Sequence, residues 1–258
     1  MSYTLLSNIF YLILSYFQTK LIYNNTNIDS QYLSIDNGFI KVYLSAVLGY
    51  TTISSVGVIF DLYSNYNRKY KIQPKYLNSK EYIQSISLSL FNLIFITPLV
   101  TIPIWKQLNK KDSYFYIKSE DTNIILSNEI LCFVGCILFV EIWFYITHLL
   151  FHTDFLYKNI HKLHHKYKYP VASACMFAHP IEFAIGNLLG VILGPFLTNC
   201  HIYTFCMWVC FALLSTGGSH SGYYILGGEE HDIHHQYFKY NYGSIGLMDK
   251  IFGTNYYI

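Results

Sequence analysis

Residues 131–165 read LCFVGCILFVEIWFYITHLLFHTDFLYKNIHKLHH, and this stretch decides the fold. Leu131 to Phe151 is apolar over about the ~20 residues that a helix needs to cross a bilayer. Glu141 is its only acidic residue, and because a carboxylate is costly in lipid we expect it to face protein or a bound ion. Histidines then recur at spacings of three and four residues, which share one helix face. The stretch predicts a membrane helix that leads into a metal site.

The composition is that of a membrane protein. Of the 258 residues, 53% are hydrophobic and only 12% are charged, against about 25% charged in an ordinary soluble domain. The mean hydropathy is +0.28. Aromatic residues make up 19% of the chain, which suits interfacial belts and an apolar substrate cavity. The formal net charge of +2 is too small to favour nucleic-acid binding.

The six cysteines form no CxxC pair and no disulfide framework. They lie in apolar stretches or between histidines: Cys132, Cys136, Cys175, Cys200, Cys206 and Cys210. We expect them to act as small apolar side chains in the bilayer or the core. Ligation of a metal by thiolates is the alternative.

Further apolar stretches accompany the opening one. Val42 to Phe60 and Ile83 to Trp105 are long enough to cross a bilayer. Tyr3 to Phe17 is shorter, and it could span the membrane, anchor at its surface or resemble a signal segment. These stretches predict several membrane helices in the first half of the chain.

The last apolar region, Ile181 to Leu214, has a different pattern. It is interrupted near its middle by Gly194, Pro195 and Asn199. Each half is then about 13–15 residues long, which is short for a full crossing. We therefore expect a re-entrant or shallow hairpin, whose flanking residues His179 and His220 emerge on the same side.

The predicted fold class is an all-α integral membrane helical bundle, with about four spanning helices plus this hairpin. Residues 1–130 would form an N-terminal transmembrane region and residues 131–258 the catalytic region, within one structural domain. Basic residues gather between residues 68 and 80 and again between 158 and 168. The positive-inside tendency places both segments in the cytosol, together with a histidine-rich helical cap that holds a di-metal site.

All 11 histidines lie between His148 and His235. Ten form a pattern of one HxxxH, two HxxHH and two single residues: His148, His152, His161, His164, His165, His179, His220, His231, His234 and His235. Ten imidazoles exceed the needs of one ion and suit two octahedral ions, with about five nitrogens each. We predict short surface helices over Tyr157 to Lys168 and Glu229 to Phe238 that present the two HxxHH motifs. His201 fits no pattern, and we interpret it as structural.

Iron fits this ligand set better than zinc, which usually takes four ligands and often a thiolate. Zinc could replace iron in a purified sample. Neutral imidazoles bring no charge, so nearby carboxylates are candidates for orienting the imidazole N–H groups. The candidates are Asp154, Glu182, Asp232 and Asp249, each of which could equally be an ordinary surface or capping acid. We predict no catalytic residues beyond the metal ligands.

The order of these motifs resembles the fatty acid hydroxylase/sterol desaturase superfamily of membrane di-iron oxygenases. Within the superfamily, the chain is most similar to the C4-methylsterol monooxygenase-like branch. The resemblance covers roughly Glu141 to Thr254. Its elements are YKNIHKLHH at residues 157–165, AHPIE at 178–182, HSGY at 220–223, NYG at 241–243 and DKIFGT at 249–254. Leu149 and Met248 depart from residues common among relatives, and the segment between His220 and His231 is short.

The resemblance implies oxidation of an unactivated C–H bond by two irons and O2. Electrons would come from NAD(P)H through cytochrome b5 or a reductase, in the endoplasmic reticulum membrane with the site facing the cytosol. C4-methylsterol oxidation in sterol biosynthesis is the first interpretation. Sterol 25-hydroxylation, desaturation and hydroxylation of a fatty-acyl or sphingoid chain are alternatives within the same chemistry. A metal-binding transport or scaffold protein is the non-enzyme alternative.

Overall fold

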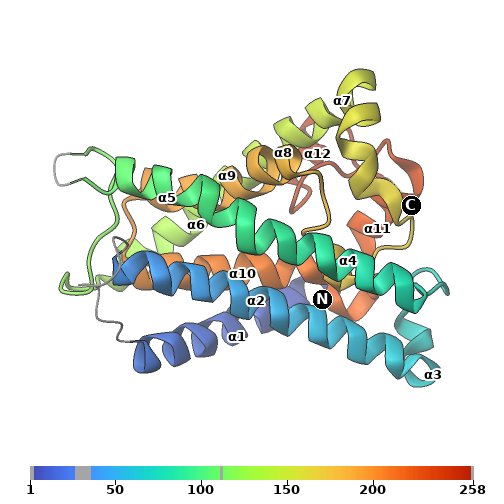
Figure 1. Ribbon diagram of the computed structural model, residues 1–258, viewed down its shortest axis with the longest axis horizontal. Helices are drawn as coiled ribbons and strands as arrows, with labels where there is room; N and C mark the ends of the chain where they lie inside the picture. Colours follow the sequence, from blue (N-terminus) through green and yellow to red (C-terminus); the bar gives the residue numbers. More distant parts are fainter. Residues whose placement is uncertain (1–2, 27–35, 111–112, 257–258) are drawn as a thin grey trace.

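The structure is a computed structural model that describes residues 3–26, 36–110 and 113–256. Its described residues form helices and two isolated bridges, with no strand among them. The long helices lie along the long axis of the molecule, and the short helices gather at one end (Figure 1). The long helices are α1 (Tyr3–Asn25), α2 (Asn37–Leu62), α4 (Ser79–Phe91), α5 (Thr97–Leu108), α6 (Leu126–Phe151), α9 (Leu189–Thr198) and α10 (Ile202–Ser219). The short helices are α3 (Ser64–Asn67), α7 (Asp154–Asn159), α8 (Pro180–Glu182), α11 (Glu229–Tyr237) and α12 (Leu247–Phe252).

Six helical stretches in the described residues are long and apolar enough to cross a membrane. Three of them are the predicted spans on α2, on α4 through α5, and on α6. The chain is a multi-pass membrane protein. The outward face of α6 shows how the bundle meets lipid, because Leu131, Ile142 and Ile146 recur on it with 47% to 69% of their surface exposed.

The stretch Tyr3 to Phe17, left open by the sequence, belongs to a helix that extends to Asn25. With 23 residues this helix is also long enough to span the membrane.

The hairpin has longer arms than the sequence predicts. One arm is the continuous helical stretch Pro180–Thr198 and the other is α10, with 19 and 18 residues. Of the three residues expected to break this region, only Asn199 does so: it adopts the left-handed conformation where the chain turns, whereas Gly194 and Pro195 lie inside α9. A Cβ on Gly194 would lie 3.2 Å from the backbone of Cys136, so this glycine serves close packing of α9 on α6 rather than a turn.

Two stretches of wider, π-helical winding interrupt the membrane helices: η3 (Asn92–Ile96) between α4 and α5, and η6 (Phe183–Leu188) between α8 and α9. The buried amide of Asn92 donates to the carbonyls of Met176 and Ala178, at 2.9 and 3.0 Å. Tyr50 on α2 donates to the Ser173 carbonyl at 3.0 Å. The N-terminal helices therefore hold the segment of residues 173–178, which runs beside the histidines.

The two basic segments of the sequence meet at the same end of the bundle. Ile72 donates its backbone N–H to the Gly222 carbonyl at 2.9 Å. The Gln73 amide donates to the Lys168 carbonyl at 2.8 Å. Both contacts lie at the end where α3, α7 and α11 are found (Figure 1).

Candidate metal centre

Nine imidazoles meet in two groups at this end of the bundle. The first, the five-histidine group, comprises His148, His152, His161, His165 and His234. The second, the four-histidine group, comprises His164, His220, His231 and His235. Within each group one ring nitrogen per residue lies within 4.8 Å of all the others. Eight of the nine side chains are buried.

The two groups draw their members from four parts of the chain. His148 and His152 lie at the C-terminal end of α6, and His220 directly follows α10. Each HxxHH motif is divided, since His161 and His165 join one group while His164 joins the other. On α11, His234 joins the first group while its neighbours His231 and His235 join the second. Each HxxHH motif therefore contributes histidines to both groups.

The expected α-helix over Tyr157 to Lys168 is wrong in part. Helix α7 ends at Asn159, and Ile160 leaves the helical conformation with φ −127° and ψ −65°. The first HxxHH then forms a tighter 3-10 turn, η4 (His161–Lys166). The helix expected over Glu229 to Phe238 is present as α11, which ends one residue earlier at Tyr237.

The imidazole nitrogens Nε2 converge within each group. In the five-histidine group, Nε2 of His161 lies 2.9 Å from Nε2 of His165 and 3.1 Å from that of His152. In the four-histidine group, Nε2 of His231 lies 2.9 Å from Nε2 of His220 and 3.1 Å from that of His235. Such short distances need either a shared proton or a positive ion between the nitrogens.

The opposite ring nitrogen, Nδ1, decides between these readings. It donates to a backbone carbonyl in five rings: His148 to Tyr242 (2.8 Å), His164 to Phe177 (3.3 Å), His220 to Thr216 (2.8 Å), His234 to Tyr240 (2.7 Å) and His235 to Tyr167 (3.0 Å). A neutral imidazole has one N–H, so in these rings Nε2 carries a lone pair. Two of these rings, His164 and His220, bring their nitrogens Nε2 within 3.5 Å of each other, and a donor set of such facing lone pairs fits a divalent transition metal. The buried Nε2 of His148, which has no hydrogen-bond partner, fits the same conclusion.

Burial keeps these rings neutral. It lowers the pKa of His152, His161 and His220 to about 3 and that of His164 to about 4. The pKa values of the α11 histidines also fall well below the ordinary value, first through burial and then through neighbouring imidazoles. Neutral rings offer the free lone pairs that metal binding requires.

One of the four candidate carboxylates touches an imidazole. Glu182 accepts from Nδ1 of His161 at 2.7 Å, and both side chains are buried. Asp232 is fully buried but accepts from the amides of Gln73 and Gln236, at 2.9 and 2.7 Å. Asp154 is exposed in the first turn of α7. Glu182 is therefore the carboxylate that orients a ligand directly.

Asp249 acts on the site through the backbone. Its carboxylate accepts from the N–H groups of Tyr242 and Gly243, at 2.8 and 2.7 Å. Glu141 accepts from the backbone N–H groups of Ser244, Ile245 and Met248 and from the Ser244 hydroxyl. The Tyr242 carbonyl orients His148. Glu141, in membrane helix α6, thus faces protein, as expected, and fixes the segment next to the metal ligands.

His179 lies outside both groups. Its Nδ1 accepts from the backbone N–H of Ile181 at 3.2 Å and so caps helix α8. The four-histidine group consequently has one imidazole fewer than the pattern of ten predicts. His201, the residue interpreted as structural, caps α10 in the same way through the N–H of Tyr203 at 3.0 Å, and it belongs to neither group.

Sequence reasoning missed the carbonyls of Tyr167, Phe177, Thr216 and Tyr240. No side-chain pattern marks them, because any residue supplies a carbonyl. The NYG element around Tyr242 was visible as a motif, although its role was not.

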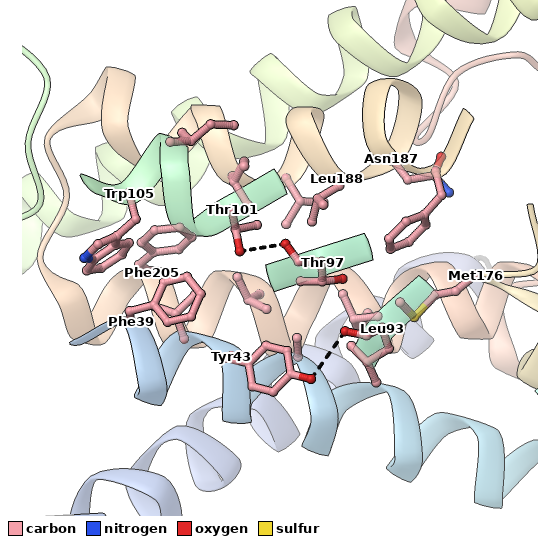
Figure 2. A pocket seen from close by; sticks show the side chains of 18 of the residues that line it. Phe39, Tyr43, Leu93, Thr97, Thr101, Trp105, Met176, Asn187, Leu188 and Phe205 are labelled. Carbon is pink, nitrogen blue, oxygen red and sulfur yellow. Dashed lines mark hydrogen bonds between the residues drawn. The ribbon is translucent and has the colours of Figure 1, made fainter. Parts of the chain in front are cut away.

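An apolar cavity of about 90 Å³ lies next to residues that hold the four-histidine group. Figure 2 shows side chains that line it. Met176 lines it and precedes Phe177, whose carbonyl accepts from His164. Thr216 also lines it, and its carbonyl accepts from His220. The cavity runs from there between α2, α5, α9 and α10 to the rings of Phe39, Trp105 and Phe205.

Comparison with known proteins identifies a matching family model and several relatives. Residues 133–254 match the family model described as Fatty acid hydroxylase. The chain is 41% identical to Fatty acid hydroxylase domain-containing protein 2 of Homo sapiens over 118 residues, which are 45% of this chain and 35% of that protein. It is 35% identical to Methylsterol monooxygenase 1 of Rattus norvegicus over 134 residues, 47% of this chain and 45% of that protein.

A third relative aligns along most of both chains. Very-long-chain aldehyde decarbonylase GL1-11 of Oryza sativa subsp. indica is 28% identical over 254 residues, 88% of this chain and 92% of that protein. By contrast, the alignments with the human and rat proteins span less than half the length of each. No solved structure matches the chain.

Proposed function

We propose that this chain, whose residues 133–254 belong to the fatty acid hydroxylase/sterol desaturase superfamily, is a membrane di-iron oxygenase that oxidises a C–H bond of a lipid. The observation that carries the proposal is the pair of imidazole groups, one of which is held by residues next to an apolar cavity. Iron held by these imidazoles supplies the activation of O2. In hydroxylation, a lipid R–H, O2, two electrons and two protons give R–OH and water.

Different residues of the chain would hold the irons, orient their ligands and line the substrate cavity. The five-histidine group and the four-histidine group would each hold one iron. The Nδ1–H bonds to carbonyls and to Glu182 keep the nitrogens Nε2 aimed at the ions. The four-histidine group borders the cavity through Met176 and Thr216, so a lipid in the cavity approaches that group. Apolar walls exclude water from the reacting carbon.

We further propose that the site faces the cytosol from the endoplasmic reticulum membrane. Exposed lysines flank the first HxxHH, at Lys158, Lys162 and Lys166, and support the cytosolic orientation. Cytochrome b5 or a reductase would deliver electrons from NAD(P)H at this end of the bundle.

A 4-methylsterol is the first candidate substrate, and the similarity to a methylsterol monooxygenase supports it. A straight-chain lipid is the second candidate. It is favoured by the longer alignment, since the relative matched over 88% of this chain is named for a very-long-chain aldehyde.

Lipid mass spectrometry of cells that lack the gene tests the proposal. Accumulated 4-methylsterols would support the first substrate, and loss of oxidised acyl chains would support the second. Rescue with the wild-type chain should restore the profile, whereas rescue with His164→Ala should not.

Purified protein provides the complementary test. It should contain two irons and consume O2 only when lipid substrate and reductant are both present. Protein that bound zinc alone, and stayed inactive after iron reconstitution, would support a metal-binding transport or scaffold role instead.

A further inference from the structure

We propose that Asn92 is a positioning residue for the candidate metal ligand His164, and that it acts through the backbone carbonyl of Phe177. The inference rests on the proposed function and deepens it, because it names a residue that holds one ligand of the four-histidine group in place. Asn92 lies outside residues 133–254, which match the family model, so that match assigns it no role.

Three polar residues form a stripe that runs along α4 into η3. Ser85, Ser89 and Asn92 are spaced four and three residues apart, which places them on one helix face, and each is fully buried. They belong to the helical stretch Ser79–Leu108, which is long and apolar enough to cross a membrane. Polar side chains in such a helix are expected to face protein partners rather than lipid. We refer to these three residues as the polar stripe.

The two serines of the polar stripe bind one end of the segment of residues 173–178. The hydroxyls of Ser85 and Ser173 lie 2.9 Å apart, and the Ser89 hydroxyl donates to the Ser173 carbonyl at 2.9 Å. Tyr50 of α2 donates to the same carbonyl at 3.0 Å. These contacts fix the position of residue 173.

Asn92 binds the other end of the segment, next to a candidate metal ligand. Its amide donates both hydrogens, to the carbonyls of Met176 and Ala178, at 2.9 and 3.0 Å. Its Oδ1 has no hydrogen-bond partner in the described part of the chain, so the two donated bonds alone fix the amide. The carbonyl between them, that of Phe177, accepts from Nδ1 of His164. Asn92 therefore holds the residues on both sides of the carbonyl that orients His164.

The bond that orients His164 is the one that most needs such support. At 3.3 Å it is the longest of the five bonds from Nδ1 to a carbonyl, since the others measure 2.7 to 3.0 Å. A long hydrogen bond is a weak one. The position of the Phe177 carbonyl must therefore depend on other contacts, and loss of the Asn92 donors should act on the four-histidine group first.

The wide turn of η3 holds Asn92 itself in place. The Asn92 carbonyl accepts from the backbone N–H of Thr97 and from its hydroxyl, the latter at 3.1 Å. Single π-helical turns of this kind are frequent at functional sites. From this turn onward, Leu93, Thr97 and Thr101 line the cavity (Figure 2). The turn thus marks where the helical stretch changes from holding the segment of residues 173–178 to lining the cavity.

Asn92→Asp tests the two donated bonds at nearly constant side-chain size. An ionised carboxylate has the shape of the amide but donates no hydrogen, so it repels the carbonyls of Met176 and Ala178. The full chain in lipid nanodiscs, freed of metal, would be titrated with Co²⁺ and followed by its visible absorption. His231→Ala and His148→Ala assign the two binding phases to the two groups. We expect the Co²⁺ affinity of the four-histidine group to fall roughly 10–100-fold and that of the five-histidine group to stay the same.

Cys175 reports the position of the segment without any metal. It lies inside the segment, it is buried, and it lines the cavity. In metal-free Asn92→Asp, alkylation of Cys175 by N-ethylmaleimide should be faster on the order of tenfold, because unpaired buried carbonyls destabilise the packed segment. Cys206 and Cys210 of α10 should stay protected, and peptide mass spectrometry distinguishes the three thiols.

Gln107→Glu is the matched control. It makes the same amide-to-carboxylate change at an exposed position near the other end of the same helical stretch. Both Co²⁺ phases and the reactivity of Cys175 should be those of the wild type. Asn92→Ala is the second variant, since it removes both donors without adding a buried charge. It should act in the same direction, and it replaces Asn92→Asp if that variant does not fold.

The outcomes separate this inference from the proposed oxygenase activity. Unchanged Co²⁺ affinity of the four-histidine group in a folded Asn92 variant would overturn the inference even if the protein oxidises lipid. Equal loss from both groups, with Cys175 still protected, would indicate general destabilisation and would also overturn it. Selective loss from the four-histidine group in a chain that oxidises no lipid would support the inference and remove the proposed activity.

Discussion

The two ends of the cavity are built on different principles. At the histidine end, rings are fixed by hydrogen bonds to carbonyls and a carboxylate, such as His161 to Glu182 at 2.7 Å. At the far end, four rings from four helices are fixed chiefly by packing: Phe39, Trp105, Phe196 and Phe205. Hydrogen-bonding groups therefore fix the rings at the histidine end, whereas the packing of four distant helices fixes the rings at the other end. Changes at the histidine end should abolish metal binding and turnover, whereas changes at the far end should leave metal binding intact.

The largest expected effect comes from removing a ligand. His234→Ala deletes a ring whose Nε2 lies 3.2 Å from Nε2 of both His152 and His165. Loss of an outer hydrogen-bond partner alone costs 10–100-fold in activity or affinity, so loss of a ligand should lower turnover by more than ~100-fold. Membrane insertion should be unchanged, as measured by carbonate extraction. Substantial activity would remove His234 from the ligand set.

Metal removal separates the two ends directly. A chelator should lower the stability of the purified protein, by about 2.7 kcal/mol if the metal had been present at 100 times its Kd. The four far-end rings should keep their packing, because none of them belongs to either histidine group. Thermal unfolding with and without chelator measures the first effect. An unchanged Tm after verified metal loss would show that the histidine end is stable without an ion.

Glu182→Gln should have an intermediate effect. The substitution keeps the size of the side chain but removes the charge that strengthens its bond to His161. We expect metal affinity to fall roughly tenfold, at the lower end of the range for such partners. Asp154→Asn is the control, because Asp154 is exposed on α7. Equal loss of affinity in both variants would argue against a specific role for Glu182.

Asp249→Asn should mainly affect stability. The fully buried carboxylate accepts from Tyr242, Gly243 and the Thr254 hydroxyl, at 2.7 to 2.8 Å. Weakening bonds to a charged acceptor should cost about 1.5–3 kcal/mol. We also expect some loss of metal, because the segment bearing the Tyr242 carbonyl orients His148. Thermal unfolding and metal analysis, with exposed Asp121→Asn as the control, measure both effects.

The sequence predicted that the patterned histidines gather, because residue type and spacing mark such a set, and their role as metal ligands stays a prediction. Nine of the ten patterned histidines come together, although each HxxHH is divided between the groups. Helical spacing alone could not predict this division, since two ions can lie on either side of one helix. The break at Ile160, which sets the first HxxHH in a 3-10 turn, also depends on contacts outside the motif.

The fold was predictable where apolar length decides it. Spans on α2, α4–α5 and α6 follow from hydropathy. The hairpin was misjudged because Gly194 and Pro195 suggest a break, whereas packing of Gly194 against Cys136 keeps the helix continuous. The far-end cluster of rings could not be predicted, because residues 39, 105, 196 and 205 share no motif and meet only when four helices pack.

His201→Ala should have the smallest effect and sharpens the comparison most. It is the histidine outside the pattern, and it lies directly before α10 at the far end of the cavity, where its backbone N–H donates to Glu129 at 2.8 Å. The substitution removes a helix cap, which should cost about 1 kcal/mol. Metal content should stay the same and turnover should change by less than about twofold, because the backbone bond to Glu129 survives the substitution. Metal analysis beside His234→Ala measures this difference, and loss of iron from the His201 variant would show that the two ends are coupled.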